Sequence, residues 1–165
     1  MEGCRELRGD DEVTKAWSDG TFPHDRPIGR GGSIEAKAVE TYFRDKTLDD
    51  VRLEGLKRDY PHDPAACLVF MTDEAFAFFL PAFMRIALDD YKVADSIPEA
   101  VINRLVDMAE GRDNERRDAV LQSYSRADVD SISRFLKTMS ELYWHEYPDD
   151  AALRAYAYWK DPRAQ

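Results

Sequence analysis

The chain has 165 residues, which is the size of one domain with a single sizeable hydrophobic core. Its 23 lysines and arginines against 33 aspartates and glutamates give a net charge of -10, which disfavours binding to nucleic acid and favours a basic protein partner. Two cysteines are too few for a disulfide framework and no apolar run approaches the roughly 18 residues that cross a bilayer, so we expect a cytoplasmic single domain, 1–165, without a membrane contact.

The first 20 residues are charged and weakly periodic, and we expect a weakly ordered N-terminal segment. A loop rich in proline and glycine follows and ends in GRGGS, 29–33. Backbone N–H groups at a helix start can bind a phosphate, but this stretch has neither the P-loop pattern nor a preceding strand. The simpler interpretation is that Ser33 caps the next helix.

Apolar residues recur at helical spacing along 34–44, starting at Ile34. Thr47 and Asp50 approximate a capping box and predict a second short helix that reaches Lys57. The sequence DYPHDP, 59–64, then prevents continuation. The apolar run 65–70 fits a helical turn, an irregular segment or one short buried strand.

The densest apolar stretch is 72–91, and its spacing predicts the central helix of the core. Thr72 is the expected N-cap. The residues expected to face the core are Phe76, Phe79, Leu80, Phe83, Ala87, Leu88 and Tyr91.

Pro81 interrupts this helix, because it has no N–H and leaves the carbonyl of Ala77 without its helical partner. A kink that wraps the helix around its core is the first interpretation. The alternative is that the freed carbonyl contacts a ligand or a partner.

Three further helices are predicted before residue 148. Ser96 caps the first, with Pro98 in its opening turn and Gly111 as its stop. The charged segment 112–124 is expected to be helical and mostly exposed. Ser125 and Asp128 form a capping box for a second main core helix, whose apolar face starts at Val129.

Pro148 should end that helix, and Asp149 or Asp150 should cap a last one. Leu153, Tyr156 and Trp159 are then expected to fold back onto the body. This many helical patterns, with few alternating segments, predict an all-α single domain.

The segments FMTDEAFAFFLPAFMRIAL, TYFRDKTLDDV, SRADVDSISRFLKTM and ALRAYAYWK resemble an uncharacterised bacterial family of small stand-alone proteins. Its members share the core F-L-x-P-E-(G/A)-F-x-(Y/F)-(Y/F)-L-P-A-(Y/F). Asp73 stands where that pattern usually has proline, and Leu48 stands near a common aromatic position. The resemblance covers about 21–160, supports the fold and implies no activity.

Groups typical of catalysis are scattered. His24, His62 and His145 lack zinc-ligand spacing, and no serine lies in a nucleophile elbow, so we expect no metal, no cofactor and no catalytic residue. The alternative is a small-ligand-binding protein or a hydrolase-type enzyme, in which His62, His145 and dispersed carboxylates converge in a pocket.

The C-terminal stretch 143–159 mixes aromatic rings with carboxylates, a combination that suits a protein interface when the rings are not all in the core. We expect a non-enzymatic immunity protein that occludes the active surface of a basic toxin or secreted effector. The predicted partner-binding residues are Trp144, Glu146, Tyr147, Asp149, Asp150, Tyr158, Asp89 and Asp90.

Overall fold

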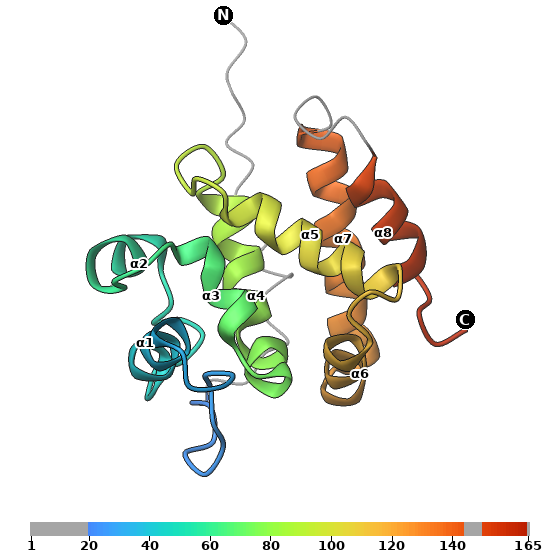
Figure 1. Cartoon of the computed structure of the whole chain (residues 1–165). Coiled ribbons are helices and arrows are strands. Elements are labelled where there is room, and N and C mark those ends of the chain that lie inside the picture. Colours follow the sequence, from blue (N-terminus) through green and yellow to red (C-terminus); the bar gives the residue numbers. More distant parts are fainter. Residues whose placement is uncertain (1–19, 144–149, 165) are drawn as a thin grey trace, which may run out of the picture.

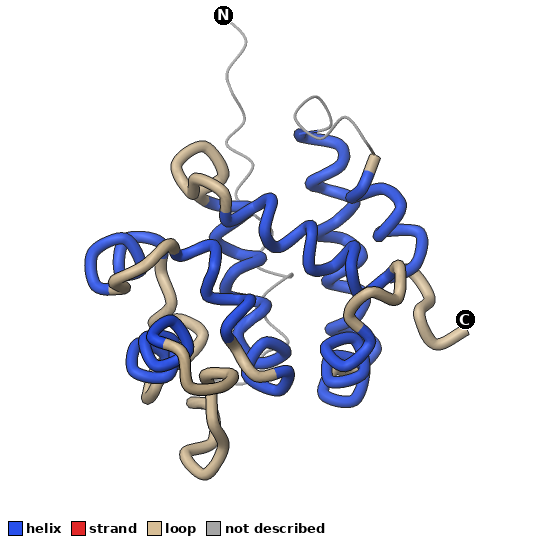
Figure 2. The backbone as a smooth tube through the Cα atoms, in the orientation of Figure 1, coloured by secondary structure: helices blue, strands red, loops and turns tan. Residues whose placement is uncertain are grey.

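The computed structural model describes residues 20–143 and 150–164, and this part of the chain is built from helices around a central one (Figure 1). Almost all of the predicted N-terminal segment lies outside the described residues. Figure 2 shows helices and loops but no strand in the described part, so the predicted all-α class is confirmed. The elements are α1 (Ile34–Phe43), α2 (Leu53–Asp59), the 3-10 turn η1 (Pro64–Ala66), α3 (Cys67–Phe70), α4 (Asp73–Asp89), α5 (Ile97–Ala109), α6 (Asn114–Ser123), α7 (Arg126–Tyr143) and α8 (Ala151–Trp159).

The central helix is α4, as its apolar spacing predicts. Phe76, Phe79, Leu80, Phe83 and Ala87 are buried. Burial of each large side chain contributes about 1.5 to 3 kcal/mol before the entropy cost, so this helix supplies a large part of the hydrophobic stabilisation.

Helix α4 contacts neighbours on several sides. From α1, the ring of Phe43 lies 4.9 Å from that of Phe79 and 6.0 Å from that of Phe83. From the N-terminal loop, the ring of Phe22 lies 5.6 Å from that of Phe78. Helices α5, α6 and α7 pack against the remaining sides of α4 (Figure 1).

Two of the predicted caps form as expected on the N-terminal side of the fold. The hydroxyl of Thr72 accepts a hydrogen bond from the N–H of Ala75, and that of Ser33 accepts one from Ala36. Ile34, by contrast, is 73% exposed, because it falls on the outer side of α1.

The predicted capping box at Thr47 forms a turn rather than a helix start. The carboxylate of Asp50 accepts hydrogen bonds from the N–H and the hydroxyl of Thr47, and the N–H of Asp50 donates back to that hydroxyl. The helix itself begins only at Leu53. The side-chain pair therefore stabilises a tight turn, which the same two residue types can do without a following helix.

The segment 65–70 is helical, so the strand alternative is wrong. Asp63 caps η1 through a bond from the N–H of Ala65, and α3 continues directly from η1. Cys67 and Leu68 are buried, while Val69 is exposed.

Two predicted helix boundaries in the C-terminal half are confirmed, whereas Pro148, the predicted end of α7, lies outside the described residues. Gly111 follows α5 with φ +76°, a conformation that favours glycine. The box between Ser125 and Asp128 forms in both directions, with N···O distances of 2.8 and 3.2 Å. Ser96 precedes α5 but makes no side-chain cap bond.

Helix α8 packs against α5 and α7, with Trp159 as its largest buried side chain. Trp159 is fully buried, and its indole N–H donates to the carbonyl of Leu105 at 3.1 Å. Tyr156 is half-buried, whereas Leu153 is 51% exposed and does not fold back as expected. Asp150 holds the N-cap position of α8 with φ 53° and makes no side-chain cap bond.

The carbonyl that Pro81 frees in α4 has a partner within the chain. The hydroxyl of Tyr124 donates a hydrogen bond to the carbonyl of Ala77, and the side chain of Tyr124 is buried. This carbonyl therefore forms a hydrogen bond within the chain and not the ligand or partner contact considered from the sequence. Among the described residues, every helix is too short or too polar to span a membrane.

Candidate functional site

The described members of the predicted partner surface lie in two separate places. Asp89 and Asp90 end α4, whereas Asp150 precedes α8 and Tyr158 lies in its last turn. In Figure 1 the end of α4 and helix α8 are on different sides of the molecule. Tyr158 is half-buried and packs edge-on against the ring of Trp159 at 5.5 Å. The remaining predicted positions lie outside the described residues: Trp144, Glu146, Tyr147 and Asp149.

A groove of about 740 Å³ lies on the described surface. Its lining contains five carboxylates and one arginine, so we call it the acidic groove. Its apolar and aromatic lining includes Phe22, Leu48, Phe78 and Tyr124. The charged residues that line it are Asp73, Glu74, Glu115, Asp118, Asp128 and Arg26.

Helical spacing explains why these residues share one surface. On α4, the groove residues Asp73 and Ala77 lie one turn apart, and so do Glu74 and Phe78. On α6, they follow a three- and four-residue spacing from Glu115 to Ser123. Because α6 packs beside α4, the two faces form adjacent walls.

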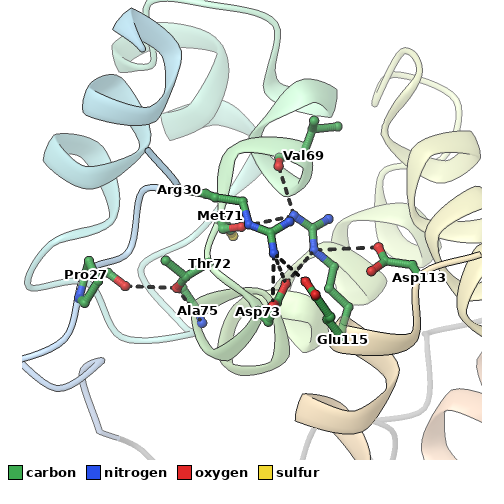
Figure 3. Close-up of polar contacts among 10 residues, drawn as sticks. Pro27, Arg30, Val69, Met71, Thr72, Asp73, Ala75, Asp113 and Glu115 are labelled. Carbon is green, nitrogen blue, oxygen red and sulfur yellow. Dashed lines mark hydrogen bonds and ion pairs between the residues drawn. The ribbon is translucent and has the colours of Figure 1, made fainter. Parts of the chain in front are cut away.

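Asp73 and Glu115 of the acidic groove belong to a network of ion pairs (Figure 3). Figure 3 shows Arg30, Asp73 and Glu115 pointing toward one another, with Arg30 Nη2 at 3.1 Å from both carboxylates. Arg26 adds a pair to Glu74 at 3.1 Å. These pairs are at least partly exposed, and each contributes on the order of 0 to 1 kcal/mol to stability.

Arg116 lies behind this network and is almost fully buried. Its Nη2 donates to the carbonyls of Val69 and Met71 at 2.9 and 3.0 Å, and its guanidinium lies 4.9 Å from the centroid of the Phe76 ring. Its Nε is 3.4 Å from the carboxylate of Asp73. Burial lowers the pKa of Arg116, but the nearby carboxylates oppose that shift. Arg116 thus joins α6 to the start of α4 beneath the groove.

Asp128, in the first turn of α7, also lines the acidic groove. It is only 7% exposed. Its Oδ2 accepts the N–H of Ser125 at 2.8 Å, whereas Oδ1 has no hydrogen-bond donor among the described residues. A buried carboxylate oxygen without a donor is unusual and costly. Within the described residues, Oδ1 therefore has no polar partner and also exposes almost no surface.

The structure does not assemble the histidine site of the enzyme alternative from the described residues. His62 is exposed in the turn before η1, with its ring 5.9 Å from that of Tyr60, and it does not line the acidic groove. His24 is exposed and pairs with Asp45 at 3.2 Å. His145 lies outside the described residues. In 20–143 and 150–164, no three histidine, cysteine or acidic side chains are disposed to hold a metal ion.

The glycine-rich loop before α1 binds an anionic group of the chain itself. The carboxylate of Glu40 accepts the N–H groups of Ile28 and Gly29 at 2.6 and 2.9 Å and pairs with Arg44. Burial raises the pKa of Glu40, but the hydrogen bonds from Arg44, Gly29 and Ile28 outweigh it and lower the pKa overall. Gly29 has no room for a Cβ, because one would collide with the carbonyl of Ala36. An internal carboxylate therefore occupies the N–H of Gly29, the first residue of the stretch considered for a phosphate.

Sequence reasoning missed the acidic groove. The segment 112–124 is helical and mostly exposed, as expected, but Arg116 and Val120 are buried and anchor that helix to the body. The signal present in the sequence was the spacing of Glu115, Asp118 and Gln122, which places them along one helical face. Their position opposite the first turn of α4 depends on tertiary packing.

One comparison with known proteins gives a match. The sequence model described as "Family of unknown function (DUF6714)" matches residues 30–163, which is most of the chain. No curated protein and no solved structure matches. Activity therefore has to be argued from the surface itself.

Proposed function

The chain belongs to the family of unknown function DUF6714, and we propose that it is a non-enzymatic module that binds a basic protein through the acidic groove. The observation that supports this proposal is the lining of the groove, where five carboxylates and one arginine lie beside Phe22 and Phe78. Protein interfaces combine buried aromatic area with complementary charge, which sets specificity and association rate. The chain as a whole is also negatively charged, with a net charge of -10.

In its specific form, the proposal is that of an immunity protein in a bacterial cytoplasm. Such a protein would neutralise a cognate basic toxin or effector by covering its active surface. Electrostatic steering raises the association rate of oppositely charged proteins, and a protective inhibitor depends on fast capture. The small size of the chain and its acidic charge fit this role.

A small-ligand-binding protein is the second candidate. The groove volume of about 740 Å³ lies in the range of small-molecule sites, about 300 to 1,000 Å³. The carboxylates of the groove would favour a cationic ligand over an anionic one. If this second candidate is right, the purified chain binds a small cationic molecule and needs no protein partner.

The test is affinity capture from the native host with the immobilised full chain, at about 0.05 M and about 1 M salt, because the Debye length falls to about 3 Å at the higher value. The groove variant combines Glu74→Gln with Asp118→Asn, two exposed positions in the lining. Its matched control combines Asp130→Asn with Glu141→Gln, which removes the same charge from exposed positions on α7.

We expect the wild type and the control to capture a basic protein at low salt. The groove variant should not capture it. The captured protein, purified, should bind the chain with a salt-dependent affinity, and its toxicity on expression should be suppressed by the chain. Equal capture by the groove variant, or capture that does not involve a basic protein, would refute the proposal. Suppression that fails despite tight binding would refute the immunity role alone.

A further inference from the structure

We infer that the acidic groove recognises an arginine side chain of the partner at Asp128, with Asp128 Oδ1 as the hydrogen-bond acceptor. This inference rests on the proposed function and adds the chemistry that the partner must present. It depends on the internal partners of the groove carboxylates, the environment of Asp128 and the aromatic rings beside it.

The other four carboxylates of the groove already have cationic partners from the same chain. Each lies 3.1 to 3.4 Å from an arginine, in the pairs Glu74–Arg26, Asp73–Arg30, Glu115–Arg30 and Asp118–Arg117. A cation from another molecule would have to compete with these arginines. The four carboxylates therefore contribute mainly to the field of the groove and less to specific contacts.

Asp128 differs from the other four in both burial and hydrogen bonding. Its side chain is more than nine-tenths buried and lines the groove. The N–H of Ser125 occupies Oδ2 and fixes the carboxylate, while Oδ1 has no donor among the described residues. A charged donor from outside would satisfy this oxygen once a side-chain movement uncovers it, since Oδ1 exposes almost no surface. Hydrogen bonds between two charged groups are about twice as strong as neutral ones.

The aromatic lining favours arginine over lysine. Tyr124 and Phe78 both line the groove that contains Asp128. A guanidinium is planar, is weakly hydrated and stacks on aromatic faces while it donates from its edge. An ammonium group is a compact and strongly hydrated charge, so it gains less from the rings and loses more on leaving water.

The experiment titrates the full-length, isotope-labelled chain with three capped tripeptides, followed by amide chemical shifts. The central residue of the tripeptide is arginine, lysine or citrulline, the last being the neutral isostere of arginine. We expect weak binding of the arginine peptide, with the largest shifts at Tyr124 and Asp128. The citrulline peptide should bind at least about 10-fold more weakly, because it lacks the charge.

The variant Asp128→Asn keeps the shape of the side chain, and its carbonyl oxygen can still accept the N–H of Ser125. It should weaken binding of the arginine peptide by at least about 10-fold. The control Asp130→Asn removes the same charge from an exposed position on α7 and should leave binding unchanged. Thermal unfolding of both variants reports whether the fold is kept, and the citrulline peptide tests the charge on the wild type independently of any variant.

The inference is wrong if the arginine and citrulline peptides bind equally, if Asp128→Asn binds the arginine peptide as the wild type does, or if the shifts map away from the groove. Equal affinity for the lysine peptide would overturn the assignment to arginine. The outcome is separable from that of the proposed function. A captured basic protein that Asp128→Asn binds normally refutes this inference alone, whereas peptide binding without any captured basic protein refutes the protein partner alone.

Discussion

The hydroxyl of Tyr124 donates a hydrogen bond of 2.5 Å to the carbonyl oxygen of Ala77, which lies in the middle of α4 and 47 residues earlier in the chain. This carbonyl needs an external donor because Pro81, four residues on, has no N–H. Both side chain and carbonyl are buried, so the bond satisfies a group that water does not reach. It also ties the end of α6 to the central helix beside the acidic groove.

Replacing Tyr124 with phenylalanine should therefore destabilise the protein. The change keeps the ring and removes only the hydroxyl, which leaves the Ala77 carbonyl without its donor. Loss of a partner to a buried polar group costs about 1 to 3 kcal/mol. The free energy of unfolding from urea denaturation, followed by circular dichroism, measures this cost.

Tyr156→Phe is the matched control, because Tyr156 is only half-buried in α8. Its effect should stay within about 0.5 kcal/mol. A Tyr124→Phe variant as stable as this control would mean that another group, such as a bound water, satisfies the Ala77 carbonyl.

The sequence predicted the fold well where a signal is local. The apolar spacing of 72–91, the cap at Thr72 and the stop at Gly111 all depend on residues within a few positions of one another, and all three are confirmed. It failed where a local pattern has two outcomes. Thr47 and Asp50 make the same reciprocal bonds in a turn as in a helix start, and only the later path of the chain decides.

The candidate site was less predictable because it depends on contacts between residues that are far apart in the sequence. Pro81 predicted that the carbonyl of Ala77 lacks its helical donor, but no neighbouring residue in the sequence indicated Tyr124 as the replacement donor. Arg116 lies in a strongly charged segment, where a solvated face is the usual outcome. Its guanidinium is buried against the carbonyls of Val69 and Met71, which are 47 and 45 residues away in the sequence.

Arg116→Met should be strongly destabilising, although methionine fills similar space. It removes the donor of the Val69 and Met71 carbonyls and leaves Asp73 with Arg30 as its remaining close cation. Breaking a buried charged contact costs about 3 to 5 kcal/mol. Urea denaturation measures the loss.

The control for Arg116→Met is Arg117→Met, a change at the next residue on α6, which forms an ion pair with its neighbour Asp118. This change should cost less than about 1 kcal/mol. If Arg116→Met is as mild as Arg117→Met, the guanidinium is not the link between α6 and the start of α4.

Glu40→Gln should loosen the loop before α1. The neutral amide keeps one acceptor but loses the charge that attracts Arg44 and the N–H groups of Ile28 and Gly29. We expect a loss of about 1 kcal/mol and faster hydrogen exchange of those two amides. Glu54→Gln, at an exposed position on α2, should change neither quantity.

The pH dependence of the Glu40 variant gives a second measurement. Because the pKa of Glu40 is lowered in the folded chain, its contribution is present above the ordinary carboxyl pKa and is lost as the pH falls through the folded value. The wild type should thus lose more stability than Glu40→Gln between neutral pH and about pH 3. Parallel acid profiles would show that the Glu40 carboxylate does not hold this loop.

Alkaline pH should also destabilise the fold, through buried groups that are neutral when folded. Burial raises the pKa of Cys67 from 9.0 to about 12 and that of Tyr42 from 10.0 to about 12, and it raises those of Tyr60 and Tyr124 as well. The folded chain therefore keeps protons that the unfolded chain releases. Stability is fully present below about pH 9 and falls as the pH rises toward about 12.

Cys67→Ala isolates one of these groups, because alanine has no proton to lose. The variant should be less stable than the wild type at pH 8, where it lacks the packing of a buried thiol, but its stability should fall less steeply between about pH 9 and 12. Urea denaturation at several pH values, with a reductant present, gives both slopes. Identical slopes would mean that the Cys67 thiol ionises in the folded protein as readily as in the unfolded one, which its full burial in the core opposes.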